Sequence, residues 1–359
     1  RIGSGDVDRL ACWLADLPDA QVAHDPWLCL AAAWVALQTG RTDQMDRWIL
    51  RAEGHAGADW RARAHEEPYA AQLAVIEAVV GREGLHATEV LARAALGGLP
   101  AESPFRAAAS FVLGVALTLG RDIVPGQRML ADAERLARAL GVPLVQADSL
   151  SWQGVLALTA GDLPSARRTI RRATDIVVHH RLERLTTAAH CLTAQALLQS
   201  LAHDPEAPAT LATARRLTAD LGDSVPWFTV CGRLIQARAA VALEDGALTR
   251  QLLVEARARM TPDLRESLAQ DLYEEIERAL GQLTIDGLHT PALTAAELRV
   301  LQFLPSHVQL HQIGEHLFVS TNTVKTHVMA IHRKLGVSTR DEAVARARVL
   351  GLLEAPPLD

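Results

Sequence analysis

Apolar residues that are followed three positions later by alanine recur along the first 285 residues at a nearly constant interval. The six pairs are Ile49/Ala52, Leu91/Ala94, Leu130/Ala133, Ile170/Ala173, Leu211/Ala214 and Leu253/Ala256. Their alanines are 42, 39, 40, 41 and 42 residues apart. Since residues three apart lie on one face of a helix, each pair predicts a helix whose small alanine lets a neighbouring helix approach closely.

A turn signal next to these pairs divides each repeat into two helices. The signals are Gly40-Arg41, Gly81-Arg82, Gly120-Arg121-Asp122, Gly161-Asp162, His203-Asp204-Pro205 and Asp245-Gly246. A helical hairpin cannot bury its apolar face alone, so about six stacked hairpins are expected to form a superhelix with a concave binding surface. The period near 41 exceeds the 34 residues of a tetratricopeptide repeat (TPR), which makes the predicted array TPR-like. The alternative is chance regularity in a chain rich in alanine and leucine.

Three features after the array predict a second domain. Gly, Thr, Asp and Pro in Gly281–Thr294 predict a linker at residues 286–292, between a repeat domain at 1–285 and a second domain at 293–359. The motifs Thr294–Glu297 and Thr339–Glu342 match capping boxes and predict helix starts.

Between these two helices, the pattern predicts a short helix, a tight turn and a longer helix. The short helix is expected around Gln312–Leu317, and Ser320 is a natural N-cap for the longer one, Thr321–Leu335. On the longer helix a buried stripe is expected at Val324, Val328, Ile331 and Leu335, and an exposed face at Asn322, Lys325, Thr326, Met329 and Arg333. This arrangement is typical of a helix-turn-helix, whose second helix enters the major groove of DNA.

Composition supports an all-α fold and places the positive charge locally. Hydrophobic residues make up 49% and aromatic residues 4%, which favours helices that pack through small side chains. The formal net charge is −6, of which the first 290 residues carry −7. Of the 36 basic residues only two are lysines, Lys325 and Lys334, and both lie in Ser320–Arg340, which carries +4 and no acid. Such a segment suits phosphates and guanine edges.

Other classes of site are not favoured by the sequence. The four cysteines are scattered without a C-x-x-C pair, which fits a cytoplasmic protein without disulfides or a zinc ribbon. Histidines at 307, 311 and 316, and at 179 and 180, are better explained as surface residues than as metal ligands. No catalytic motif or phosphate-binding loop occurs, so neither an enzymatic activity nor a cofactor is expected. The longest apolar run, 107–120, is too short to cross a membrane, and the seven tryptophans are expected mainly in the repeat core.

A set of residues in the C-terminal segment matches a known family pattern: Leu293, Thr294, Glu297, Val300, Leu301, Ile313, Leu317, Ser320, Thr323–His327, Ile331, Lys334–Val337, Arg340 and Ala343. At these residues the segment resembles the DNA-binding module of LuxR-type transcription regulators. The resemblance implies four helices, base reading by Lys325, Thr326 and Met329, and a dimer formed by the last helix. The predicted DNA-binding residues are Ser320, Asn322, Thr323, Lys325, Thr326, Met329, Arg333 and Lys334. The sequence departs from the family pattern at Ala296, at Gly314 and in Pro305–Val308.

A helical array joined to this module is similar to the C-terminal part of the large ATP-binding LuxR-type regulators, which resemble the maltose-regulon activator. Since no G-x-x-x-x-G-K-[ST] motif occurs here, either an ATP-hydrolysing module precedes this segment or the chain is a short relative. The expected function is a regulator that binds double-stranded DNA as a homodimer and receives an effector or partner in the array groove. The alternative is a repeat scaffold for protein partners, with the C-terminal unit as a docking module.

Overall fold

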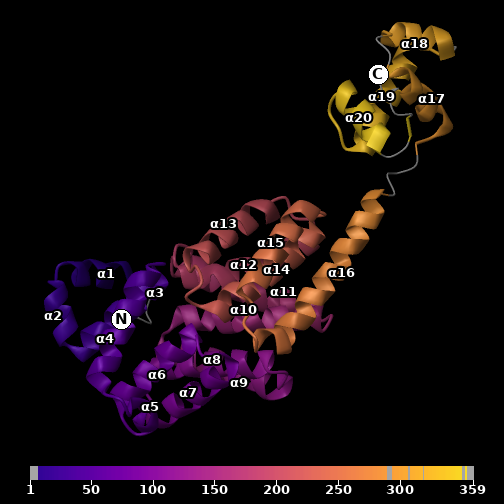
Figure 1. Ribbon diagram of the computed structural model, residues 1–359. Helices are drawn as coiled ribbons and strands as arrows, with labels where there is room; N and C mark the ends of the chain where they lie inside the picture. Colours follow the sequence, from indigo (N-terminus) through magenta and orange to yellow (C-terminus); the bar gives the residue numbers. More distant parts are fainter. Residues whose placement is uncertain (1–6, 289–292, 306–307, 318, 350–351, 354–359) are drawn as a thin grey trace. The chain divides into compact units, whose positions relative to one another are not determined.

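The computed structural model describes residues 7–288, 293–305, 308–317, 319–349 and 352–353. Within these residues the regular structure is helical and no strand occurs, which confirms the predicted all-α class. The chain divides into two compact units, residues 1–280 and 281–359, each with its own hydrophobic core (Figure 1). None of the helices at the described positions combines the length and apolar character that crossing a bilayer requires.

Six helical hairpins follow one another in the described part of the first unit (Figure 1). They are α3 (Pro26–Gln38) with α4 (Thr42–Ala56), α6 (Pro68–Val80) with α7 (Leu85–Gly98), α8 (Phe105–Leu119) with α9 (Ile123–Leu140), α10 (Pro143–Thr159) with α11 (Leu163–His179), α12 (Ala189–Leu201) with α13 (Ala207–Asp220), and α14 (Pro226–Ala242) with α15 (Gly246–Arg259). The remaining helices are α1 (Val7–Ala15), α2 (Asp19–His24), α5 (Trp60–Arg63), the 3-10 helices η2 (Thr186–Ala188) and η3 (Leu264–Glu266), and α16 (Leu268–Leu288).

In every hairpin, a residue with a positive φ angle lies just after the first helix. These residues are Gly40, Gly81, Arg121, Gly161, His203 and Glu244. In five of the six turns the next N–H donates to a carbonyl five residues earlier, from Arg41 to Ala36, Asp122 to Leu117, Asp162 to Ala157, Asp204 to Gln199 and Asp245 to Ala240. This is the bond of a Schellman motif, which satisfies a carbonyl left unpaired at the end of the first helix. The turn signals in the sequence therefore mark the hairpin turns.

The two helices of a hairpin are buried to different degrees. The first helices are buried almost all round, as α8 is from Ala107 to Leu119, whereas the second helices bury one stripe. In five of the six apolar/alanine pairs both residues are at most 4% exposed. The second pair differs, because in α7 the buried alanine is Ala95, four residues after Leu91, while Ala94 is only half-buried.

Small residues on the first helices make room for these pairs, a signal that the sequence analysis missed. Ala74, Gly114, Gly154 and Ala194 recur 40 residues apart, and all four are buried. A Cβ atom on Gly114 would lie 2.9 Å from Cγ of Leu130, and one on Gly154 would overlap Ile170. A larger side chain at either glycine would therefore push the two helices of the hairpin apart.

The array curves back on itself. Residues of its first three hairpins contact residues that lie 148–150 positions later in the sequence. The Leu37 carbonyl accepts a hydrogen bond from the Thr186 hydroxyl at 2.7 Å, and the Val79 carbonyl accepts one from Trp227 Nε1 at 2.7 Å. Arg121 forms an ion pair with Asp271. Paired rings fill the centre, from Phe111, Trp152, His190, Trp227 and Phe228. The centre of the described array, where a concave surface was expected, is thus mostly packed with its own side chains.

Five of the seven tryptophans are buried, as expected for repeat core: Trp34, Trp48, Trp60, Trp152 and Trp227. The other two, Trp13 and Trp27, are 50% and 48% exposed. Trp27 contacts Tyr69 edge to face, with ring centroids 5.1 Å apart.

The predicted linker differs from the structure at its start. Helix α16 continues to Leu288, so it covers residues 286–288, and residues 289–292 lie outside those described. The boundary between the compact units falls after Leu280 and not after residue 285. A single glycine costs a helix only about 1 kcal/mol, so Gly281 does not end α16.

The second unit packs four helices around a separate core. They are α17 (Ala295–Phe303), α18 (Leu310–Leu317), α19 (Thr321–Leu335) and α20 (Arg340–Val349). The buried core consists of Leu293, Val300, Leu301, Leu304, Ile313, Val324, Ile331, Leu335, Ala343, Val344 and Ala347. Helix α19 has the predicted bounds, and the other three begin within two residues of their predicted starts.

Candidate nucleic-acid interface

Helix α17 begins at the capping box predicted from the sequence, and the same box is bonded to α19. The Glu297 N–H donates to Thr294 Oγ1 at 3.3 Å, and the Glu297 carboxylate accepts from the Thr294 N–H at 2.6 Å. Glu297 Oε2 also lies 2.6 Å from Lys334 Nζ, and these side chains are only 7% and 18% exposed. The hydrogen bond from Lys334, together with those from Thr294, holds the pKa of Glu297 below its usual range.

This ion pair gives Lys334 a position that differs from the predicted one. The sequence analysis placed Lys334 on the DNA-facing surface, but its ammonium group is directed to α17 within the unit. Lys334 lies three residues after the buried Ile331, so its stem borders the apolar stripe of α19. We therefore leave Lys334 out of the candidate interface.

Arg340 is the second basic residue of Ser320–Arg340 whose side chain binds groups of the protein itself. Its guanidinium donates to the carbonyls of Leu304 at 2.9 Å, Val308 at 3.0 Å and Phe303 at 3.3 Å. The last carbonyls of a helix lack partners within it, so Arg340 satisfies the end of α17. Two of the four charges counted in Ser320–Arg340 thus stabilise the fold.

The turn from α18 into α19 is tight at Gly314 and capped at Ser320. The Val319 N–H donates to the Gly314 carbonyl at 2.9 Å, and a Cβ atom on Gly314 would lie 2.7 Å from the Val319 carbonyl oxygen. The glycine that departs from the LuxR-type pattern therefore suits this turn. Ser320 Oγ accepts from the Thr323 N–H at 3.1 Å, which is the N-cap predicted from the sequence, and it also lies 2.8 Å from Thr323 Oγ1.

Helix α19 has one buried stripe and one exposed polar face, as its periodicity predicts. Val324, Ile331 and Leu335 are buried and Val328 is half-buried. The exposed side chains are Ser320, Thr321, Asn322, Lys325, Thr326 and Met329, with Thr323 half-buried beside them. The side chain of Arg333 lies outside the described residues. The recognition face is defined here as Asn322, Lys325, Thr326 and Met329.

Met329 and its neighbours give the recognition face a mixed chemistry. Met329 is 73% exposed, more than any other large apolar side chain found exposed in the described chain. Lys325 and Thr326 precede it by four and three residues, so the three side chains are neighbours on one helix surface. The Lys325 ammonium group is suited to a guanine edge, and the Met329 side chain is suited to the thymine methyl group. The Thr326 hydroxyl can donate a hydrogen bond to a base or accept one from it.

Helix α20 begins at the second predicted capping box. The Glu342 carboxylate accepts from the N–H groups of Ser338 and Thr339, and these bonds hold its pKa below the usual range. Three apolar residues of α20, Ala343, Val344 and Ala347, are buried in the core of the unit. Its exposed side chains are Asp341, Glu342, Ala345, Arg346 and Arg348. The described surface of α20 is therefore mainly charged.

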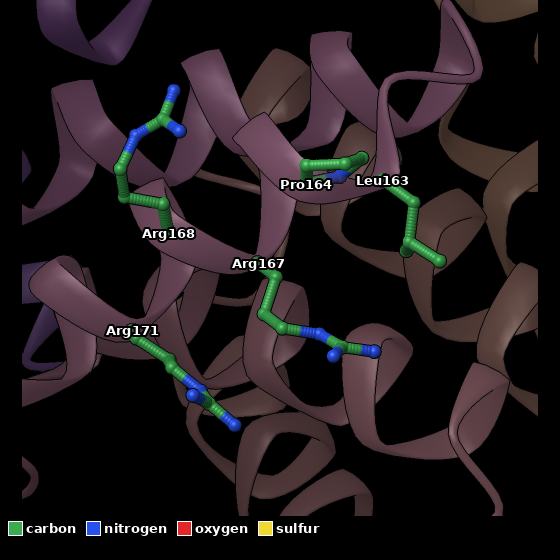
Figure 2. A pocket seen from close by; sticks show the side chains of 5 residues that line it. All are labelled: Leu163, Pro164, Arg167, Arg168 and Arg171. Carbon is green, nitrogen blue, oxygen red and sulfur yellow. The ribbon is translucent and has the colours of Figure 1, made fainter.

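A second basic surface lies on α11 of the array. A shallow groove of about 550 Å³ is lined by Leu163, Pro164, Arg167, Arg168 and Arg171. Arg167 and Arg171 extend to the same side of the helix, and Arg168 extends to the other (Figure 2) and donates to Ser165 Oγ at 3.0 Å. This surface matches no recognition helix, so it supplies a control for charge that is not part of the recognition face.

Comparison with protein families identifies the second unit. Residues 291–347 match the family described as bacterial regulatory proteins, luxR family. The second unit contains a LuxR-family helix-turn-helix domain. The domain implies DNA binding and transcription regulation.

Related proteins agree with this assignment over part of the chain. The HTH-type transcriptional regulators MalT of Yersinia pestis (strain Pestoides F) and of Yersinia pseudotuberculosis serotype O:1b are 29% identical over 125 residues. These matches cover 30% of this chain but only 14% of each relative. No solved structure is significantly similar to the chain.

Proposed function

We propose that this chain is a transcription regulator that binds double-stranded DNA as a homodimer, and that its TPR-like array receives an effector or partner signal. The observation that carries the proposal is the recognition face on α19. Asn322, Lys325, Thr326 and Met329 point away from a helix whose opposite side is buried in the LuxR-family domain. Such exposed side chains on a second helix read base edges in the major groove.

The predicted DNA-binding residues other than Lys334 have three kinds of proposed role. Lys325, Thr326 and Met329 contact base edges, and Asn322 reaches the bases or the phosphates at the start of the helix. Ser320 and Thr323 lie at the N-terminus of α19, where hydroxyl and N–H groups suit a phosphate. Arg333 is proposed to contact phosphate from the far end of α19.

The salt dependence of DNA binding tests whether the charge of α19 contacts phosphate. For the full chain, the slope of log affinity against log salt should be less steep by up to about 0.9 in Lys325→Ala, if Lys325 neutralises one phosphate. The matched control is Arg167→Ala/Arg171→Ala on the array, which should leave the slope unchanged. An equal change in the control would show that DNA also contacts the array.

The proposed dimer uses the charges on α20. Asp341 and Glu342 lie in its first turn, and Arg346 and Arg348 lie in its last turn. Two antiparallel copies related by a two-fold axis would place the acidic turn of each against the basic turn of the other. A dimer also supplies two recognition helices for half-sites about one helical turn apart.

Charge reversal tests this dimer. Arg346→Glu/Arg348→Glu should weaken dimerisation of the full chain on DNA by about tenfold, because two sets of exposed ion pairs become repulsive. Adding Asp341→Arg should restore part of the loss. Sedimentation velocity gives the number of chains per DNA duplex, and one wild-type chain per duplex at saturation would contradict the proposal.

A further inference from the structure

A small cavity lies within the array, where the first helices of the first, second, third, fourth and sixth hairpins meet. Its volume is about 70 Å³, and its wall includes residues of α3, α6, α8, α10 and α14. Rings of Trp34, Phe111, Trp227 and Phe228 form much of that wall. All of these residues belong to the first compact unit, so the cavity is built within one folded body.

Four polar atoms of residues that line this cavity have no hydrogen-bond partner in the described structure. They are Trp34 Nε1, Gln38 Oε1, Asp148 Oδ1 and Thr187 Oγ1. Trp34, Gln38 and Asp148 are only 5–6% exposed, so bulk water does not satisfy them. Buried polar atoms in folded proteins nearly always have a partner, and a group of unpaired ones calls for a bound molecule.

The chemistry of these atoms favours a cation over a neutral or anionic molecule. Asp148 forms no ion pair with any described residue, and Gln38 adds a second acceptor oxygen. Burial of this unpaired carboxyl group raises its pKa well above the usual range, because no positive charge compensates it. Trp34, Phe111, Trp227 and Phe228 also line the cavity, and the faces of aromatic rings attract cations.

We propose that this cavity binds a small organic ammonium ion, which donates hydrogen bonds to Asp148 Oδ1 and Gln38 Oε1 and contacts the rings of Trp34 and Trp227. A cavity of about 150 Å³ takes benzene with its six carbon atoms, so one of about 70 Å³ suits a ligand of roughly three non-hydrogen atoms. Only the role of this ion as an effector of the regulator rests on the proposed function. Its binding is measured without DNA.

Thermal unfolding of the full chain provides the first test, with ethylammonium chloride as the probe. Potassium chloride at the same ionic strength and ethanol at the same concentration are the controls for salt and for size. Ethylammonium should raise the Tm more than either control, because a ligand that binds only the folded chain stabilises it. Equal shifts with all three additives would overturn the proposal.

Two variants then locate the site. Asp148→Asn keeps the shape of the side chain and should weaken ethylammonium binding by at least about tenfold, because a charge-assisted hydrogen bond is lost. Asp175→Asn removes the same charge from an exposed position on α11 and should bind as the wild type does. Unchanged binding by Asp148→Asn, or a crystal structure in ethylammonium chloride with only water in the cavity, would contradict the assignment. If Asp148→Asn does not fold, the comparison of the three additives on the wild type decides whether the ammonium ion binds.

Discussion

Replacing Lys334 by methionine is expected to lower the free energy of unfolding of the C-terminal unit by about 2–4 kcal/mol. The variant keeps the stem of the side chain but leaves the Glu297 carboxylate buried at 7% exposure without its cation. A core of this size rarely supplies more than about 3–5 kcal/mol, so much of the unit should unfold. Hydrogen exchange of α17 and α19 amides in the full chain measures the loss, and wild-type protection in the variant would contradict it.

The companion variant Glu297→Gln separates the ion pair from the capping box. An amide oxygen still accepts from the Thr294 N–H, so the cap at 2.6 Å is retained while the charge is removed. Combined with Lys334→Met, it should cost less than the sum of the two single changes, since no unpaired charge remains. Strict additivity would show that the two side chains do not interact.

The same pair makes the unit sensitive to acid. The folded-state pKa of Glu297 is lowered, so its contribution is fully present above the unfolded value near 4.3 and is lost as the pH falls through the folded-state pKa. In Lys334→Met the pKa of Glu297 should rise, and this part of the acid sensitivity should shrink. Amide hydrogen exchange of wild type and Lys334→Met, measured between pH 6 and 3, tests this difference.

Removing the Lys325 ammonium is expected to lower the DNA affinity of the full chain by roughly 5- to 150-fold, the equivalent of about 1–3 kcal/mol for one base contact. The loss should be restricted to sites with one particular base pair if Lys325 reads a guanine edge. A uniform loss across sequences would assign it to phosphate. Lys325 is exposed on α19, so Lys325→Ala should leave the stability of the unit nearly unchanged.

A control from the same unit makes the result specific. Arg299→Ala removes one exposed charge from α17 and should change affinity for every sequence by less than Lys325→Ala does. Met329→Ala should reduce preference at an A·T pair without altering the salt dependence, because it removes an apolar contact only. An affinity for Lys325→Ala equal to that of wild type on every DNA would remove Lys325 from the interface.

The repeat organisation of the array could be predicted because its signals are local. Turn residues and the apolar/alanine pairs share one period, and both describe contacts within one hairpin. The closure of the array could not be predicted, since it depends on single contacts such as that of Trp227 with Val79, which no periodicity marks. The filled centre and the unpaired Asp148 follow from that closure, so the sequence alone pointed to an open groove.

In the C-terminal unit, the helices and the recognition face were predicted better than the roles of individual charges. Capping boxes and the stripe of α19 depend on spacing alone, and both are present in the structure. Lys334 and Arg340 added to the local charge in the sequence, but each binds groups of α17 more than 30 residues away. The sequence shows that a residue is charged but not where its side chain points, because tertiary contacts decide that.

Selection of binding sites from a pool of random duplex DNA with the full chain tests the central claim, that the recognition face reads DNA sequence. Wild type is compared with Lys325→Ala/Thr326→Ala/Met329→Ala, and Arg167→Ala/Arg171→Ala is the matched control. We predict that wild type and the array control enrich the same motif, and that the triple variant, still folded by hydrogen exchange, enriches none. Enrichment of the wild-type motif by the folded triple variant would contradict the claim.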